Sequence, residues 1–273
     1  MIANHNRIVH GQRIMSLVDP NWLMLFLFLY SLAVMGFVMK FLVLIIPPPQ
    51  RVQHPYLFWL LLCPDSHKRL RSFSELRSVL WWYGFLFIML PLSCWGYSRL
   101  IYYFDYSGFL LSYAAAPILF LMSESLVGLV TLLWLPSGKV LPSLHDRPWL
   151  AQGIGEFWGR RWNLWFSDWA RYTIFQPMRR EFPLFALLMA FTISGIFHEW
   201  VINCPLFFVT GKPLFGGMML YFLIQAMGVY FERYLFKKYP ILKRPFTLCV
   251  VMIPLPLVIN EGLLRIMHLW PNP

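Results

Sequence analysis

The chain has 273 residues, of which 59% are hydrophobic and 13% are charged, and its mean hydropathy is +0.58. Soluble globular proteins are about 45–50% apolar and about 25% charged, so this composition excludes an ordinary soluble domain. It indicates one integral membrane domain over residues 1–273, and the meaning of the net charge of +11 depends on where the cations lie.

Six apolar runs are long enough to cross a bilayer as helices, which predicts an all-α, polytopic membrane protein with about six to eight transmembrane helices. The last run is the weakest, because Pro254, Pro256 and Glu261 interrupt it. Residues 56–63 are too few to cross and are expected to be re-entrant or interfacial. The first run is too long for the core of a signal peptide, so we expect it to be retained. The six runs are 22–46, 79–103, 109–135, 182–209, 214–236 and 246–270.

Lysine and arginine gather in every second connection between these runs. The connections 47–78, 136–181 and 237–245 are rich in them, whereas 104–108 has none and 210–213 has only Lys212. By the positive-inside rule the rich connections are cytoplasmic, and six spans then place both termini on the other side. This alternation argues against a nucleic-acid partner. The short loops and the lack of an organelle signal favour a bacterial inner membrane.

The run 182–209 contains two ionisable residues, His198 and Glu199, near its middle. Such residues are costly at that depth and mark a pathway or a reaction centre. An adjacent His-Glu pair is typical of zinc-protease helices, but that motif needs a second histidine at position 202, which is isoleucine. The sequence therefore predicts neither a metal site nor a bound cofactor.

A general base is the better interpretation of His198. A neutral imidazole in an apolar tunnel takes a proton from a hydroxyl as that hydroxyl attacks a carbonyl. Ser194 lies one helical turn earlier, so its hydroxyl is within reach of the ring. Glu199 projects in another direction and is expected to pair with an arginine of another helix. The alternative for His198 is a hydrogen bond that joins two transmembrane helices.

The segment 156–180 in the longest basic connection carries a stripe of aromatic residues. Their spacing of 4, 3, 4 and 3 predicts one helix with a single aromatic face, which lies along the membrane interface or packs under the spans. Asn163 stands among them without an evident structural role. The aromatic residues are Trp158, Trp162, Trp165, Trp169 and Tyr172.

Two further polar residues lie within predicted spans. Glu124 is either an acceptor-binding or proton-relay group, or the ion-pair partner of an arginine on a neighbouring helix. Gln225 is expected to form a hydrogen bond between helices.

Two separated motifs carry a family resemblance. FWGRRWN at 157–163, followed by SGIFHEW at 194–200, resembles the wax synthase domain of the membrane-bound O-acyltransferase superfamily. The segments LHDRPW at 144–149 and QPM at 176–178 also resemble that family. The resemblance covers roughly residues 140–260, and the earlier part of the chain matches only in hydropathy.

The resemblance implies transfer of an acyl group from acyl-CoA, as co-substrate, to the hydroxyl of a hydrophobic alcohol or other lipid. In that family the intramembrane histidine is the catalytic base, which implies this role for His198. Asn163 then positions the donor or stabilises an oxyanion. Substrate contacts are expected from Trp162 and Glu124. Three arginines of the loop are expected to meet the CoA phosphates or, as the alternative, lipid headgroups: Arg160, Arg161 and Arg171.

A proton-coupled transporter or flippase that uses His198 and Glu124 is the alternative from another class. A scaffold that has lost its activity is a second alternative. The sequence lacks the paired, Gly/Pro-broken half-symmetry common in transporters, and the presence of both Asn163 and His198 argues against the inactive scaffold.

Overall fold

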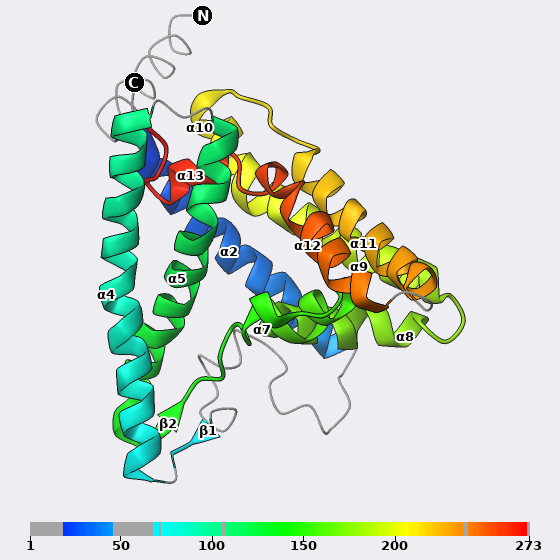
Figure 1. The fold of residues 1–273 in the computed structure, drawn as a ribbon, viewed down its shortest axis with the longest axis horizontal. Coiled ribbons are helices and arrows are strands. Elements are labelled where there is room, and N and C mark those ends of the chain that lie inside the picture. The colour runs from blue at the N-terminus through cyan, green and yellow to red at the C-terminus, as the bar shows by residue number, and fades with distance from the viewer. Residues whose placement is uncertain (1–18, 46–67, 71, 105–107, 237–239, 272–273) are drawn as a thin grey trace, which may run out of the picture.

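A computed structural model describes residues 19–45, 68–70, 72–104, 108–236 and 240–271 of the chain. These residues are mainly helical, as predicted (Figure 1). Strands Lys68–Arg69 (β1) and Lys139–Val140 (β2) form one short antiparallel pair. The predicted re-entrant segment 56–63 lies outside the described residues.

Four helices of the described part are long and apolar enough to cross a membrane, at Pro20–Val43, Phe73–Tyr103, Gly108–Ser137 and Pro183–Thr210. They agree with the first four predicted runs. The first three come from α2 (Pro20–Ile45), α4 (Phe73–Phe104) and α5 (Gly108–Trp134). The fourth joins α9 (Pro183–His198) through a π-helical turn, Glu199–Asn203, to α10 (Cys204–Thr210).

The last two predicted runs have different outcomes in the structure. The run 214–236 forms α11 (Gly217–Leu235), a 19-residue helix. The run 246–270 is not one helix but three pieces: α12 (Lys243–Met252), a 3-10 turn Leu255–Leu257, and α13 (Glu261–Ile266). Pro254 and Pro256 lack the N–H groups that a continuing helix needs, and Asn260 begins α13 by accepting a hydrogen bond from the N–H of Leu263.

The loop between α5 and α9 does not contain the single helix that the aromatic spacing predicts. Trp162 is extended and Asn163 has φ of 43°, so the chain turns sharply at these two residues. Trp158 and Trp162 consequently lie away from Trp165 and Trp169. The loop is built from short elements: α6 (Ile154–Glu156), a π turn Phe157–Arg161, α7 (Leu164–Ala170), a π turn Arg171–Phe175, and α8 (Gln176–Met178).

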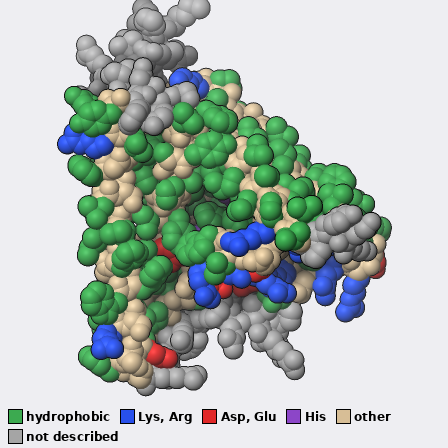
Figure 2. All heavy atoms as spheres, in the orientation of Figure 1, with side chains coloured by type: hydrophobic (Ala, Val, Ile, Leu, Met, Phe, Trp, Pro, Cys, Tyr) green, Lys and Arg blue, Asp and Glu red, His purple; other side chains and the backbone are tan. Residues whose placement is uncertain are grey.

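Helices α9 and α11 pack side by side (Figure 1). Their close approach depends on Gly195, because a Cβ at this position would come within 3.1 Å of the Met219 Cα. The face drawn in Figure 2 is largely hydrophobic, and Lys and Arg gather along its lower edge, over α7 and α8. An apolar belt with a basic edge is the surface expected of a protein that sits in a bilayer.

Candidate active site

His198 is the last residue of α9, and its ring is oriented by the helix backbone. Its Nδ1 lies 2.7 Å from the carbonyl oxygen of Ser194, one turn earlier. A carbonyl can only accept, so Nδ1 carries the proton and donates it. Nε2 is then left with a lone pair. The contact of these two residues therefore runs through the Ser194 carbonyl and not through the hydroxyl that the sequence placed within reach.

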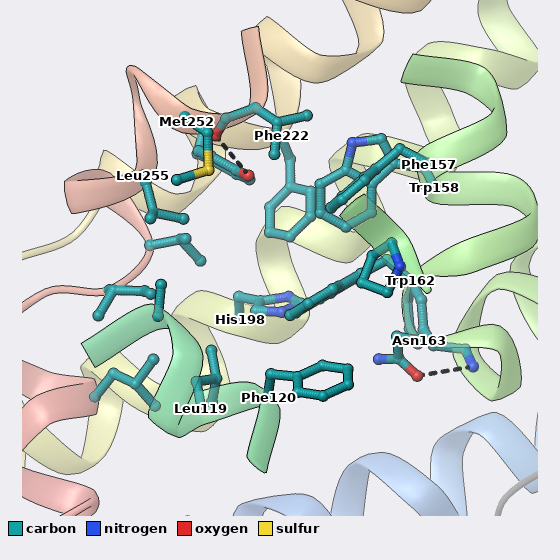
Figure 3. A pocket seen from close by; sticks show the side chains of 18 of the residues that line it. Leu119, Phe120, Phe157, Trp158, Trp162, Asn163, His198, Phe222, Met252 and Leu255 are labelled. Carbon is teal, nitrogen blue, oxygen red and sulfur yellow. Dashed lines mark hydrogen bonds between the residues drawn. The ribbon is translucent and has the colours of Figure 1, made fainter. Parts of the chain in front are cut away.

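Two cavities meet at His198. One has a volume of about 630 Å³ and the other about 440 Å³. Side chains from the loop, from α9 and from α11 line both of them, and these shared residues are Trp158, Trp162, Asn163, Phe166, His198 and Phe222. Figure 3 shows His198 with Phe120 on one side and with Trp162 and Asn163 on another. The ring centroid of Phe222 lies 4.5 Å from that of the imidazole.

The larger cavity is almost entirely apolar. Its walls come from α2, α5, α9, α11, α12 and the segment that follows α12. Two hydroxyls on this wall already have partners: that of Tyr221 donates to the Val251 carbonyl (3.3 Å), and that of Thr247 donates to the Lys243 carbonyl (2.9 Å). Figure 2 shows a hollow on the apolar face, in the region where Figure 1 places α5 and α12. This cavity suits a hydrophobic molecule that arrives from the bilayer.

The smaller cavity has a different character, because four arginines line it. They come from the loop and from the end of α11: Arg160, Arg171, Arg179 and Arg233. Gln176 and Ser167 add further polar groups to its wall. Arg171 is half-buried and is held by the Gly159 carbonyl and by Asp168 at 3.5 Å, whereas the other three arginines are exposed to solvent. This cavity suits a strongly anionic group.

Asn163 has a structural role that the sequence did not suggest. It is the N-cap of α7, and its Oδ1 accepts a hydrogen bond from the N–H of Phe166 at 3.3 Å. Its positive φ is a conformation that asparagine tolerates better than most residues. Because Asn163 also lines both cavities, capping and substrate contact are compatible with each other.

Arg161 lies outside both cavities. Its guanidinium donates to Glu156 at 2.6 Å and to the carbonyl of Asp146 at 3.2 Å. Burial raises the pKa of Glu156, but the N–H of Gln152 and the Arg161 guanidinium outweigh this effect, so that the pKa lies below its usual value. Arg161 therefore fastens the loop internally, and the structure gives it no contact with the cavity in which Arg160 and Arg171 lie.

Glu124 also lies outside both cavities, and in the contacts described its partner is a histidine and not the arginine that one of the two interpretations expected. Its Oε1 accepts two hydrogen bonds from one residue of the loop, His145, whose backbone N–H lies at 2.8 Å and whose Nδ1 lies at 2.9 Å. Both residues are buried.

Glu199 supports the fold and does not pair with an arginine in the contacts described. Its Oε1 accepts the N–H groups of Gly216, Met218 and Met219 at the start of α11, at 2.9 to 3.2 Å. Its Oε2 accepts from the Asn203 amide at 2.6 Å. A carboxylate at a helix N-terminus is favourable because it meets unpaired N–H groups and the positive end of the helix dipole.

Several residues of the site have no strong signal in the sequence. Phe222 and Arg233 reach the cavities only because α11 folds back against α9, and Arg179 reaches the smaller cavity from the end of the loop, directly after α8. Gln225 was expected to join helices, and it does so: it donates to the Val250 carbonyl at 2.7 Å and accepts from the Trp158 indole at 3.1 Å.

Comparisons with known proteins match the same part of the chain. Residues 141–224 fit the family model of the membrane bound O-acyl transferase family. The chain is similar to a long-chain-alcohol O-fatty-acyltransferase of Simmondsia chinensis, with 43% identity over 63 residues, which make up 20% of this chain and 18% of the relative. The probable long-chain-alcohol O-fatty-acyltransferase 9 of Arabidopsis thaliana is 32% identical over 119 residues (40% and 34%). Acyl-CoA–sterol O-acyltransferase 1 of the same organism is 32% identical over 87 residues (29% and 24%).

These matches confirm the wax synthase-like resemblance. The chain spans between 18% and 34% of the length of these relatives. The expected bacterial inner membrane finds no support, because the relatives are plant proteins.

Proposed function

We propose that this protein transfers an acyl group from acyl-CoA to the hydroxyl of a hydrophobic alcohol, because residues 141–224 fit the membrane bound O-acyl transferase family model and the chain is similar to long-chain-alcohol O-fatty-acyltransferases. The observation that carries the proposal is the meeting of a basic cavity and an apolar cavity at His198. An O-acyltransferase needs this arrangement, because its donor has an anionic head and its acceptor has an apolar body.

His198 acts as the general base. Its Nδ1 is engaged by the Ser194 carbonyl, so Nε2 receives the proton. The acceptor oxygen attacks the thioester carbonyl carbon while its proton passes to Nε2, and a tetrahedral oxyanion forms. The carbon–sulfur bond then breaks as the carbonyl is restored. The imidazolium returns the proton to the leaving thiolate, which yields the ester and free CoA.

Asn163 lies in the wall shared by both cavities and binds the oxygen of the reacting carbonyl group. Its Oδ1 caps α7, so its Nδ2 is the end of the amide available to donate to a thioester oxygen or to the oxyanion. Figure 3 shows this nitrogen directed away from the capping bond and toward the side of the cavity that holds His198.

The CoA moiety binds in the smaller cavity. Its phosphates pair with Arg160 and Arg171, as the sequence suggests, and also with Arg179 and Arg233. We further propose that this basic edge faces the cytoplasm. The acceptor occupies the larger cavity, and the relatives named for long-chain alcohols and for a sterol provide the two acceptor classes to test first.

A proton-coupled transporter receives less support from the geometry. The relay proposed for it joins His198 to Glu124, whereas Glu124 contacts His145 outside both cavities.

The test uses membranes that contain the protein and membranes from the same host that lack it. Both receive labelled acyl-CoA with a panel of fatty alcohols, sterols and diacylglycerol. Protein-dependent labelled ester supports the proposal. Proton-coupled flux in sealed vesicles without any ester, or no ester with any acceptor of the panel, overturns it.

A further inference from the structure

Trp162 lines both cavities, and its indole ring packs against two neighbouring rings. Its ring centroid lies 4.3 Å from that of His145 and 5.8 Å from that of Phe157, with which it is stacked at 11°. Phe157 also lines the larger cavity, whereas His145 lines neither. His145 therefore supports the wall from behind.

His145 is itself fixed by the buried carboxyl of Glu124 on α5. One oxygen, Oε1, accepts both the backbone N–H and the Nδ1–H of this residue. Two bonds to one residue fix the backbone and the ring together, and Glu124 and His145 are only 2% and 7% exposed. A carboxyl in an apolar span is costly, so its retention there needs a function.

Backbone hydrogen bonds connect the segment around His145 to the segment that contains Trp162 and Asn163. The N–H of Asp146 donates to the carbonyl of Arg161 at 2.8 Å, and the N–H of Leu164 donates to the carbonyl of Leu144 at 2.8 Å. These two bonds flank His145 on one segment and the pair Trp162 and Asn163 on the other. A displacement of segment 144–146 therefore moves both residues of the shared wall.

We propose that Glu124 and His145 form a positioning pair that holds Trp162 and Asn163 at the wall between the two cavities. The consequence of this positioning is efficient acyl transfer from a donor on one side of the wall to an acceptor on the other. This consequence rests on the proposed function. Glu124 and His145 do not touch the substrates. They act through Trp162 and Asn163.

The test compares three variants of the full chain. Glu124→Ala removes the acceptor of both hydrogen bonds. Glu124→Gln retains one oxygen that can accept them. The matched control is Thr131→Val, two turns further along α5, which removes a fully buried hydroxyl whose partner is the Tyr83 hydroxyl, 3.5 Å away.

Two readouts separate positioning from general stability. Hydrogen–deuterium exchange of the peptides that contain Asp146 and Leu164 reports the two flanking bonds without requiring activity. We expect Glu124→Ala to lose protection there, and we expect Glu124→Gln and Thr131→Val to retain it. The second readout is the amount of ester formed per acyl-CoA consumed. We expect kcat/KM for transfer to fall by up to about 10²-fold in Glu124→Ala, with a larger share of acyl-CoA lost to water.

Any of three outcomes overturns the positioning role: hydrogen exchange that is unchanged in Glu124→Ala, a loss of protection in Thr131→Val equal to that in Glu124→Ala, or a Glu124→Gln variant that is as impaired as Glu124→Ala. Absence of all turnover in the wild type would count against the proposed function instead, and the exchange measurement would still decide the positioning role.

Discussion

Replacement of Glu199 tests how strongly one carboxylate organises the site helix. In Glu199→Gln, one amide oxygen can still accept the N–H groups at the start of α11, but the other atom becomes an NH₂ that faces the amide of Asn203. Asn203 cannot turn its amide over to compensate. Its Nδ2 also donates to the Leu214 carbonyl at 3.0 Å, and its Oδ1 accepts from Asn260 at 2.9 Å.

The size of the effect follows from these contacts. Loss of one charge-assisted hydrogen bond costs about 1.5–3 kcal/mol, and loss of the charge at the α11 N-terminus adds about 0.3–1 kcal/mol. We therefore expect Glu199→Gln to lower the free energy of unfolding by about 2–4 kcal/mol. Glu199→Ala removes the acceptor of the three N–H groups at the start of α11 and of one bond from the Asn203 amide, and we expect a loss of about 3–5 kcal/mol.

The assay is denaturant unfolding of the purified protein in mild detergent, followed by tryptophan fluorescence. Glu181→Gln is the matched control, because it changes an exposed carboxylate outside the cluster and should leave the transition in place. A Glu199→Gln variant as stable as the wild type would contradict this prediction, since it would mean that the charge of Glu199 does not stabilise the fold.

Three further predictions address the cavities. Asn163→Gly keeps the positive φ and should fold well but transfer slowly, whereas Asn163→Ala should also lose about 1 kcal/mol of stability; unfolding and kcat measured on both variants check this. Arg179→Ala and Arg233→Ala should each raise the KM for acyl-CoA, by roughly tenfold for a lost charge-assisted contact, and should not change the KM for the alcohol. A KM for acyl-CoA equal to that of the wild type in both variants would contradict the assignment of the smaller cavity to CoA. Val251→Trp should fill part of the larger cavity and restrict transfer to shorter alcohols, which a chain-length series of acceptors measures.

The long apolar helices follow directly from the sequence. Runs such as 22–46 and 109–135 contain very few charged residues, and a hydrophobic run of this length has few alternatives to a helix. The run 246–270 is different, because the mean hydropathy of a run does not register how single prolines interrupt a helix. Pro254 and Pro256 remove backbone donors at two positions, and local backbone chemistry overrides the average there.

The prediction of one helix in the aromatic loop was wrong for a similar reason. Periodicity described Trp165 and Trp169 well, but Trp162 and Asn163 adopt extended and left-handed conformations that periodicity does not report. Because the helix is broken at this point, Trp162 reaches the cavity wall.

A site residue could be predicted from the sequence where its burial in an apolar run is costly in itself. It could not be predicted where it reaches the site only through the packing of a distant helix. His198 stands out because an imidazole in an apolar run needs a reason. The contact of Glu124 with His145 joins residues 21 positions apart through a loop whose path the sequence does not reveal. Arg233 likewise reaches the smaller cavity only through the packing of α11 on α9.

A single-turnover measurement on His198→Gln tests the role of His198 as the general base. Glutamine can still donate to the Ser194 carbonyl, but it cannot accept a proton from an alcohol. We predict that labelled acyl-CoA binds to this variant as tightly as to the wild type, while the rate of ester formation falls by about 10²–10⁴-fold. Ester formation at the wild-type rate would contradict the assignment of His198 as the general base.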